Sequence, residues 1–312
     1  MSYLEIITKL DDGGVVVLDG GIGTELERLG VPMHGDIWCG HALESDPEKV
    51  AEVHRLYVAA GADVITANTY CLGRQALDLA GMGHKTTEWN VRAMAIADGV
   101  RQEVAQDRTL AVAGSVAPFG VWNRMPAEEL APHMAEQAKI LAGEGADFIN
   151  LELLAASPDQ ARATVEACLG AGLPLWVSLS CLRNEATGAI DHGVRESAGD
   201  NHQRDDGPFA DVARSVMAMG GDVLCAMHSE LTVMEDAVRT LRPAWDGPLG
   251  AYPNAGYWIR PDWQFIDQVE PSAYAIEAGK WIDAGAQIVG GCCGVGPDQI
   301  AAVARTVADR AA

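Results

Sequence analysis

Basic residues are scarce in this chain of 312 residues, which has 22 Lys and Arg against 44 Asp and Glu and a formal net charge of −22. Nucleic acids and anionic membrane surfaces attach to clustered Lys and Arg side chains. The charge therefore argues against nucleic acid and membranes as partners. We interpret the acidity itself as a solvated surface that favours solubility.

Long apolar runs are also missing. Gly, Asp or Glu interrupts the apolar stretches every few residues, so none approaches the roughly 20 consecutive apolar residues that span a bilayer. The first residues, MSYLEIITKLDDGG, lack the basic and apolar regions of a secretory signal and predict a short helix. These features predict a cytoplasmic protein.

Paired cysteine motifs are absent as well. The seven cysteines contain no CxxC and are odd in number, which excludes a framework of disulfides. With 48% hydrophobic residues and no polar low-complexity tract, the chain can bury a large core. Its length fits one domain over residues 1–312. The cysteines are Cys39, Cys71, Cys168, Cys181, Cys225, Cys292 and Cys293.

One junction recurs along the chain. A helical stretch ends in Gly, one or two small or acidic residues follow, and a β-branched apolar run begins, which is typical of a helix C-cap, a tight loop and a buried strand. Eight alternating strands and helices in 312 residues predict an α/β fold with a single (β/α)8 TIM barrel. The strands are expected within 15–20, 59–70, 109–118, 143–153, 170–180, 219–229, 248–254 and 282–293.

A doubly wound open sheet is the alternative architecture, because its strands are also apolar and buried on both faces. The barrel is favoured because the predicted strands end in polar or sulfur-containing residues. A barrel brings all strand C-termini to one mouth, where its active sites lie. These residues are Asp19, Asn68, Ser115, Glu152, Ser180, His228, Asn254 and Cys292.

The segment GGCCG at 290–294 places two adjacent cysteines between glycines. Adjacent strand residues point to opposite faces, so both thiolates reach one ion only if the backbone kinks, which the flanking glycines permit. Two soft thiolates suit zinc, which takes three or four N or S ligands. We predict His228 as the third ligand, so that His228, Cys292 and Cys293 are the metal-binding and catalytic residues.

Cys225 is a weaker candidate for the metal. It lies three residues before His228, on the opposite strand face and about 10 Å deeper at ~3.3 Å per residue. We interpret it as a small buried hydrophobe packed against a helix.

Over essentially its whole length, the chain resembles the homocysteine S-methyltransferase family, which includes the betaine and S-methylmethionine enzymes. The resemblance implies a zinc cofactor and a place in methionine biosynthesis. The motifs that carry it stand in the family's order: DGGIGTELERLG at 19–30, Trp38 followed by a helix containing His54, AGADVITANTY at 60–70, Glu152 in NLELL, YPN at 252–254, and GGCCG at 290–294.

The family holds its zinc with three cysteines, and this sequence departs from that pattern. Alignment of GGDVLCAMHS with the family's segment, which usually ends in Asn-Cys, puts Met227 at the Asn and His228 at the first cysteine. A zinc ion with three thiolates carries a net charge of about −1, whereas one with His and two thiolates is about neutral. We expect a more electrophilic ion that holds a substrate thiolate more firmly and leaves it less nucleophilic.

The resemblance implies methyl transfer from a sulfonium or quaternary ammonium donor to the thiol of homocysteine or a similar small thiol. Coordination to zinc would convert the thiol into the nucleophilic thiolate. By resemblance, Glu152 would bind the amino group of the acceptor, and Asp19 and Gly20 would help to position it.

Aromatic faces suit a positively charged donor through cation–π attraction. We predict Trp38 and Tyr70 as the donor cage. Asn68, Tyr252 and Asn254 are further predicted substrate contacts. Packing beneath loops is the favoured explanation for Trp122, Tyr257 and Trp258.

Two other functions of this fold fit the sequence less well. A Schiff-base aldolase needs a lysine at a strand end, and all five lysines lie in predicted helices or outside the mouth: Lys9, Lys49, Lys85, Lys139 and Lys280. GVGPDQI, at 294–300, is a possible phosphate loop at a helix N-terminus, but the preceding dithiolate argues against it.

A non-catalytic zinc-binding or thiol-sensing barrel derived from the same family stays open, with His228 as the sign of lost catalysis. The presence of Glu152, Asp19 and the aromatic mouth speaks against it. The polar connection from Cys181 to about Asp206 is either a lid or a solvated insertion, and the sequence does not decide between them.

Overall fold

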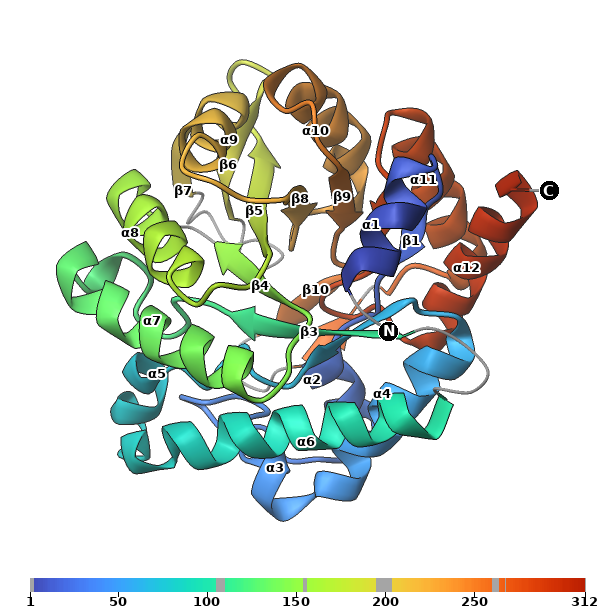
Figure 1. Cartoon of the computed structure of the whole chain (residues 1–312). Helices are drawn as coiled ribbons and strands as arrows, with labels where there is room; N and C mark the ends of the chain where they lie inside the picture. The colour runs from blue at the N-terminus through green and yellow to red at the C-terminus, as the bar shows by residue number, and fades with distance from the viewer. Residues whose placement is uncertain are drawn as a thin grey trace.

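The computed structural model describes residues 3–104, 110–153, 156–194, 204–259, 264–266 and 268–311. Eight parallel strands form a barrel, and helices surround it as an outer ring (Figure 1). The barrel strands are β1 (Val16–Val17), β2 (Val64–Ala67), β3 (Ala111–Val116), β4 (Phe148–Leu153), β5 (Leu175–Arg183), β8 (Val223–Met227), β9 (Leu249–Tyr252) and β12 (Ile288–Val289).

The barrel closes between its first two strands. Neighbours pair in the order β1-β12-β9-β8-β5-β4-β3-β2, and a parallel bridge joins Leu18 to Val64. Across this seam, Asp63 N donates to Val17 O at 2.7 Å and Asp19 N donates to Val64 O at 3.1 Å. The predicted TIM barrel is confirmed, and the open-sheet alternative is wrong because these bonds leave neither β1 nor β2 as a free edge.

The recurring junction between helix and strand also supplies hydrogen bonds between neighbouring strands. Gly61, Gly145 and Gly285 follow helices and have φ of 105°, 87° and 111°, the left-handed region that glycine adopts without a Cβ penalty. In three junctions the aspartate that begins the strand accepts a backbone N–H of the neighbouring strand. These bonds are Val17 N to Asp63 at 2.9 Å, Val112 N to Asp147 at 2.7 Å and Leu175 N to Asp222 at 2.8 Å.

The outer layer consists of helices and short 3₁₀ turns. Among the described residues, no helix has both the length and the apolar composition needed to cross a membrane. The helices are α2 (Ile22–Arg28), α3 (Ala42–Ser45), α4 (Pro47–Ala60), α5 (Arg74–Leu79), α6 (Thr86–Val104), α7 (Ala127–Gly143), α8 (Pro158–Leu169), α9 (Phe209–Met217), α10 (Met234–Leu241), α11 (Pro271–Asp283) and α12 (Pro297–Ala311), with turns η1 (Gly83–Lys85), η2 (Trp122–Arg124), η3 (Leu231–Val233) and η4 (Arg242–Ala244).

The interior of the barrel is a packed core, separate from the layer between strands and helices. Phe148 and Trp176 stack there with ring centroids 4.1 Å apart. Helix α1 (Tyr3–Asp11), the predicted N-terminal helix, contributes Ile6 and Leu10 to this inner core and covers the N-terminal end of the barrel (Figure 1). Helix α1 thus fills the end of the barrel that lies opposite to the mouth.

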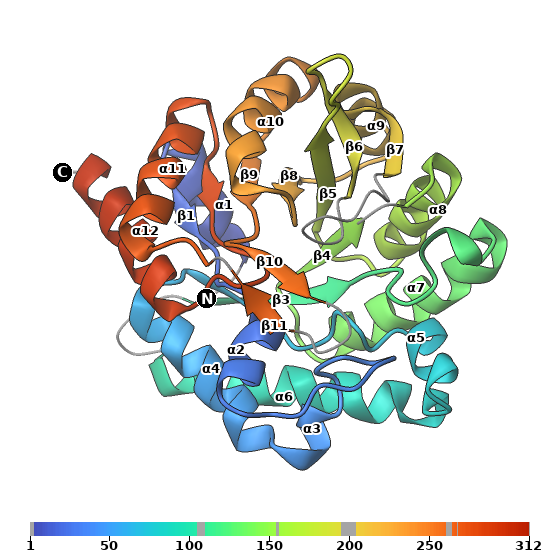
Figure 2. The same ribbon diagram turned by 180° about the vertical axis from the view of Figure 1, so that it is seen from behind.

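Two antiparallel ribbons lie at the mouth. The polar connection that begins at Cys181 extends β5 and continues into β6 (Ile190–Val194) and β7 (Arg204–Pro208). Its residues 195–203 lie outside the described ones. The second ribbon, β10 (Tyr257–Ile259) with β11 (Gln264–Ile266), crosses the opening of the barrel (Figure 2).

The inner core supports a stability prediction. Phe148→Ala should lower the free energy of unfolding by about 3–5 kcal/mol, because it removes a fully buried ring and leaves a cavity beside Trp176. Ile276 is 64% exposed, so Ile276→Ala serves as the control and should change stability by less than about 0.5 kcal/mol. Denaturant unfolding measures both. Equal losses in the two variants would contradict the assignment of the inner core.

Candidate metal centre and active site

A cavity of about 760 Å³ opens at the mouth of the barrel. One predicted site residue, Asn254, does not line this cavity. The others do: Asp19, Gly20, Trp38, Asn68, Tyr70, Glu152, His228, Tyr252, Cys292 and Cys293. The barrel thus gathers residues from the ends of six of its strands around one space.

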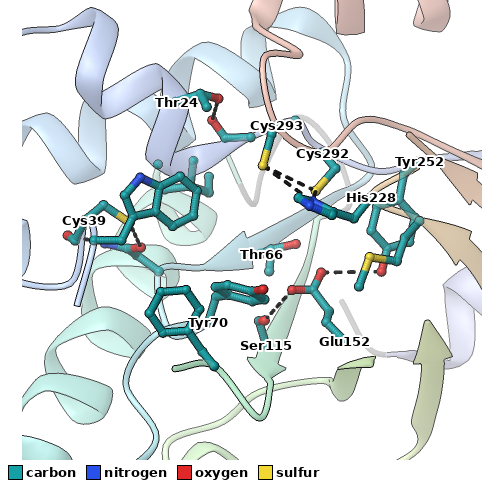
Figure 3. Close-up of a pocket in the computed structure, with 18 of the residues that line it drawn as sticks. Thr24, Cys39, Thr66, Tyr70, Ser115, Glu152, His228, Tyr252, Cys292 and Cys293 are labelled. Atoms are coloured by element: carbon teal, nitrogen blue, oxygen red, sulfur yellow. Dashed lines mark hydrogen bonds between the residues drawn. The ribbon is translucent and has the colours of Figure 1, made fainter. Parts of the chain in front are cut away.

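Three possible metal ligands converge on one side of this cavity (Figure 3). The Nδ1 atom of His228 lies 3.3 Å from Sγ of Cys292 and 3.6 Å from Sγ of Cys293, and the two sulfurs are 3.9 Å apart. Zinc bonds of about 2.3 Å to sulfur and 2.0–2.1 Å to nitrogen at tetrahedral angles require about 3.8 Å between sulfurs and about 3.5 Å from nitrogen to sulfur. The three atoms fit around a single ion, and the cavity leaves a side open for a further ligand.

His228 reaches the cavity through an unusual backbone conformation. Along β8, Cys225 and Met227 belong to the inner core, whereas Leu224 and Ala226 face the helices. Simple alternation would therefore turn His228 outward. Its φ of 43°, rare for a residue with a Cβ, instead turns the imidazole toward the two sulfurs.

The structure corrects the prediction for Cys225. It is fully buried inside the barrel, not packed against an outer helix. A Cβ added at Gly250 on the neighbouring strand would lie 2.4 Å from its Sγ, so the thiol fills the space that this glycine leaves. Cys225 is a small buried hydrophobic residue, as predicted, but it lies on the inward face of β8.

The glycines around the two cysteines have different roles. Strand β12 ends at Val289, so both cysteines lie in the loop that follows it. Gly294 has φ of 76°, in agreement with the predicted kink. At Gly291, by contrast, an added Cβ would lie 2.2 Å from Val295 Cγ1. Close packing of the loop requires this glycine.

Backbone hydrogen bonds hold the cysteine loop from two sides. Cys292 N donates to Pro253 O at 2.9 Å, and Cys293 N donates to the Asn254 side chain at 3.1 Å. On the other side, Gly294 N donates to Thr24 Oγ1 at 3.0 Å. Asn254 therefore positions a thiol from behind. Thr24, within the DGGIGTELERLG motif, was not predicted as a site residue.

The motif DGGIGTELERLG at 19–30 contains two adjacent glycines because the loop after β12 packs directly against them. A Cβ at Gly20 would lie 2.2 Å from Val295 O, and one at Gly21 would lie 2.6 Å from Cys292 O. The hydroxyl of Tyr57 on α4 donates to Val295 O at 2.9 Å. The start and the end of the chain thus form one wall of the site.

Two of the acidic residues that line the cavity, Asp19 and Glu152, are buried, and burial raises the pKa of each to about 7. Asp19 is 2% exposed and accepts hydrogen bonds from Thr66 N at 2.6 Å and Thr66 Oγ1 at 3.0 Å, which oppose the increase of its pKa. Glu152 accepts from Ser115 Oγ at 3.0 Å (Figure 3). This bond and the charge of His228 favour its ionised form. Both groups are therefore poised to ionise when a cation approaches.

A polar network beneath Glu152 was not predicted. Ser178 Oγ donates to Asn150 Oδ1 at 2.8 Å, and Asn150 Nδ2 donates to Tyr252 Oη at 3.1 Å. Tyr252 Oη in turn donates to Glu152 Oε1 at 3.4 Å. A local signal existed, because Asn150 and Glu152 are two residues apart on β4 and so share the inward face.

Four aromatic rings form a continuous wall of the cavity. The centroid of Trp38 lies 6.3 Å from that of Tyr70, which lies 5.3 Å from Phe119, and Phe119 lies 6.0 Å from Trp122. Asn68 Nδ2 donates to Cys39 O at 3.4 Å and so ties the Trp38 loop to the end of β2. Phe119 was not predicted, although it directly follows the expected strand segment 109–118. The side chains of Tyr257 and Trp258 lie outside the described part of the structure.

Comparison of the sequence with known proteins finds a matching family and related enzymes. The sequence model of the family described as homocysteine S-methyltransferase matches residues 16–307. The chain belongs to this family. Homocysteine S-methyltransferase 4 of Zea mays is 27% identical over 325 aligned positions, which cover 95% of this chain and 90% of the relative. Selenocysteine Se-methyltransferase of Brassica oleracea var. italica is 26% identical and covers 96% of this chain and 91% of its own length.

The fold of this homocysteine S-methyltransferase family member also has a solved counterpart. The crystal structure of the homocysteine methyltransferase MmuM from Escherichia coli in its metallated form superimposes with a TM-score of 0.77. The two chains are 24% identical, and the alignment covers 96% of this chain and 98% of MmuM. The likeness confirms the barrel over the full length of both proteins.

The raised pKa of Asp19 predicts a pH dependence of stability. In the unfolded chain this carboxyl ionises near pH 4, whereas in the metal-free fold it keeps its proton up to about pH 7, so the folded state loses stability as the pH rises between these values. From pH 5.5 to 8 the loss is about 2 kcal/mol for this group alone. Asp19→Asn should therefore show a smaller loss, measured by denaturant unfolding at both pH values.

Asp283→Asn is the control for this measurement. Asp283 is exposed and its pKa is lowered by Arg310, so it is ionised throughout this pH range and its removal should leave the pH dependence unchanged. An unchanged dependence in Asp19→Asn would count against a protonated Asp19 in the metal-free protein.

Proposed function

We propose that this chain transfers a methyl group from a sulfonium or quaternary ammonium donor to the thiol of homocysteine or a similar small thiol, with zinc held by His228, Cys292 and Cys293. The observation that carries the proposal is the convergence of one imidazole nitrogen and two sulfurs at the edge of a cavity that also contains the carboxyl groups of Asp19 and Glu152 and an aromatic wall. Zinc in this position would lower the pKa of the acceptor thiol and supply a thiolate nucleophile.

The carboxyl groups suit an amino acid acceptor. The names of the two plant relatives point to homocysteine and selenocysteine, which share an ammonium group and a soft side-chain nucleophile. Glu152 lies across the cavity from the three ligands, held by Ser115 and Tyr252 (Figure 3). In the proposal, Glu152 binds the acceptor ammonium, and Asp19 with the Gly20 backbone positions the rest of the amino acid.

The aromatic wall suits the donor. Trp38 and Tyr70 stand nearly perpendicular, with an interplanar angle of 80°. Two faces in this arrangement can enclose an onium group, and each contributes about 0.5–2 kcal/mol of cation–π attraction. They also exclude water from the reacting methyl group. After transfer the donor leaves uncharged at the onium atom, so its attraction to the rings falls and release is favoured.

The alternative of a non-catalytic thiol sensor has less support. A sensor needs the ligands and an acceptor site but no donor cage. The wall of four aromatic rings and the hydrogen-bonded support of Glu152 instead fit a site for two substrates. His228 then changes the charge of the metal centre and slows the nucleophile without abolishing the reaction.

A methyl-transfer assay tests the proposal. The purified protein, with its zinc content measured on the same sample, is incubated with homocysteine and a set of sulfonium and quaternary ammonium donors. We expect about one zinc per chain and formation of methionine from at least one donor. Bound metal without turnover of any donor would favour the sensor.

Metal retention tests the ligand set. His228→Ala and Cys292→Ser should each lose most of the zinc, because two donors hold the ion poorly, whereas His228→Cys should retain it with three thiolates. Cys225→Ala is the matched control, since this thiol is buried away from the cavity, and it should keep its zinc. Zinc content is measured by elemental analysis after dialysis against a weak chelator. Full retention in His228→Ala would remove His228 from the ligand set.

A further inference from the structure

The inward face of β4 changes from apolar to polar toward the mouth of the barrel. Phe148, Asn150 and Glu152 alternate along this strand and so share its inward face. Phe148 stacks on Trp176 in the inner core, whereas Glu152 lines the cavity. Asn150 lies between these two levels, is 1% exposed and does not line the cavity. A buried amide therefore lies directly beneath the carboxyl group of Glu152.

Hydrogen bonds fix the orientation of this amide. An ionised carboxylate can only accept hydrogen bonds, so the side of Asn150 that faces Glu152 must carry the NH2 group. Asn150 Nδ2 donates to Glu152 Oε1 at 3.2 Å and to Tyr252 Oη at 3.1 Å. From the other side, Ser178 Oγ donates to Asn150 Oδ1 at 2.8 Å. Ser178 is fully buried on β5 and does not line the cavity, so it acts on the site through these neighbours.

Neutral groups thus hold both oxygens of Glu152. Oε1 accepts from Asn150, with Tyr252 Oη 3.4 Å away, and Oε2 accepts from Ser115 Oγ at 3.0 Å (Figure 3). In the described part of the chain, no lysine or arginine forms an ion pair with this carboxyl group. A cation beneath it would cancel its charge, and an apolar residue would remove the nearest donor to Oε1. An amide supplies the donor and leaves the negative charge for a ligand.

We propose that Asn150 is a positioning residue for the acceptor: it holds the carboxylate of Glu152 in the orientation that receives the ammonium group of an amino acid thiol, and Ser178 holds Asn150 in turn. This proposal rests on the proposed function, because it concerns the acceptor of that reaction. It also specifies the acceptor class. The site selects small thiols with a free ammonium group, and the residues that determine this selectivity extend below the cavity into the barrel interior.

The anchoring of both oxygens explains the selectivity. A thiol bound at the three possible metal ligands would extend its amino acid end toward Glu152, on the other side of the cavity (Figure 3). A carboxylate that is held from below presents its remaining lone pairs toward the cavity, where an ammonium group can donate to them. Without Asn150 the carboxylate can turn, and the charge-assisted hydrogen bond loses its geometry.

Acceptor binding tests the proposal without any methyl donor. Isothermal titration calorimetry on the zinc-loaded protein compares L-homocysteine with 4-mercaptobutyrate, which is the same molecule without the amino group. The wild-type protein should bind L-homocysteine about 30-fold more tightly, because a charge-assisted hydrogen bond in a buried site is strong.

Two substitutions assign this preference to the buried residues. Asn150→Leu replaces the amide with an apolar group of similar size and should reduce the preference to less than about threefold by weakening only L-homocysteine. Ser178→Ala should reduce it to about tenfold, because Asn150 keeps its donors but loses its support. In both variants, the affinity for 4-mercaptobutyrate and the zinc content should stay within about twofold of the wild type, since neither residue contacts the metal ligands.

Thr164→Val is the matched control. Thr164 is fully buried on α8, its hydroxyl donates to carbonyl oxygens of the same helix, and it does not line the cavity. This variant loses a buried hydroxyl of the outer layer and should keep the wild-type preference. Denaturant unfolding establishes that each variant is folded.

The outcomes separate the two proposals. If the zinc-loaded wild type bound neither thiol, the proposed function would be overturned and this inference with it. Equal affinities of the wild type for the two thiols, or equal weakening of both by Asn150→Leu, would overturn this inference alone. If Asn150→Leu does not fold, Ser178→Ala decides, and an unchanged preference in that variant would overturn the positioning role.

Discussion

The candidate site depends on the contact between the two ends of the barrel sequence. The loop after β12 presents Cys292 and Cys293 side by side because the loops after β1 and β9 hold its backbone N–H groups. This contact needs bare backbone at Gly20 and Gly21, where a side chain would overlap the last loop. The two thiols therefore converge only in the closed barrel, and the site and the fold form together.

The cavity favours cations throughout. It contains the three possible metal ligands, and desolvation raises the pKa of Asp19 and Glu152. A metal ion, an acceptor ammonium and a donor onium group would each compensate part of this buried negative charge. The buried negative charge thus favours all three expected components of the reaction: the metal ion, the acceptor and the donor.

His228 distinguishes this chain from the three-cysteine pattern that the family resemblance implies. Its imidazole reaches the two sulfurs through a left-handed backbone conformation, which indicates that the surrounding structure holds it there. In the proposed metal centre, a neutral ligand in place of a thiolate would reduce the electron density on the metal. The expected consequence is tighter binding of the acceptor thiolate and a slower attack on the methyl group, so affinity increases at the expense of rate.

The eight-strand barrel, its N-terminal helix and the types of residue at the mouth could all be predicted from the amino-acid sequence. These features follow from local patterns: apolar runs, glycine junctions and polar residues at strand ends. The sequence also identified His228, Cys292 and Cys293 as a group, since their chemistry suits one ion. The tertiary structure alone decided how they meet, because alternation would turn His228 outward and a backbone φ is not specified by residue type.

The dependence on tertiary structure also explains which side-chain placements could not be predicted from the sequence. Cys225 faces inward, Asn254 supports Cys293 from behind, and Phe119 joins Trp122 to the aromatic wall. Each of these placements depends on which strands become neighbours around the barrel and how the loops pack on one another. Contacts between residues that are distant along the chain have no local pattern, so only the closed fold specifies them.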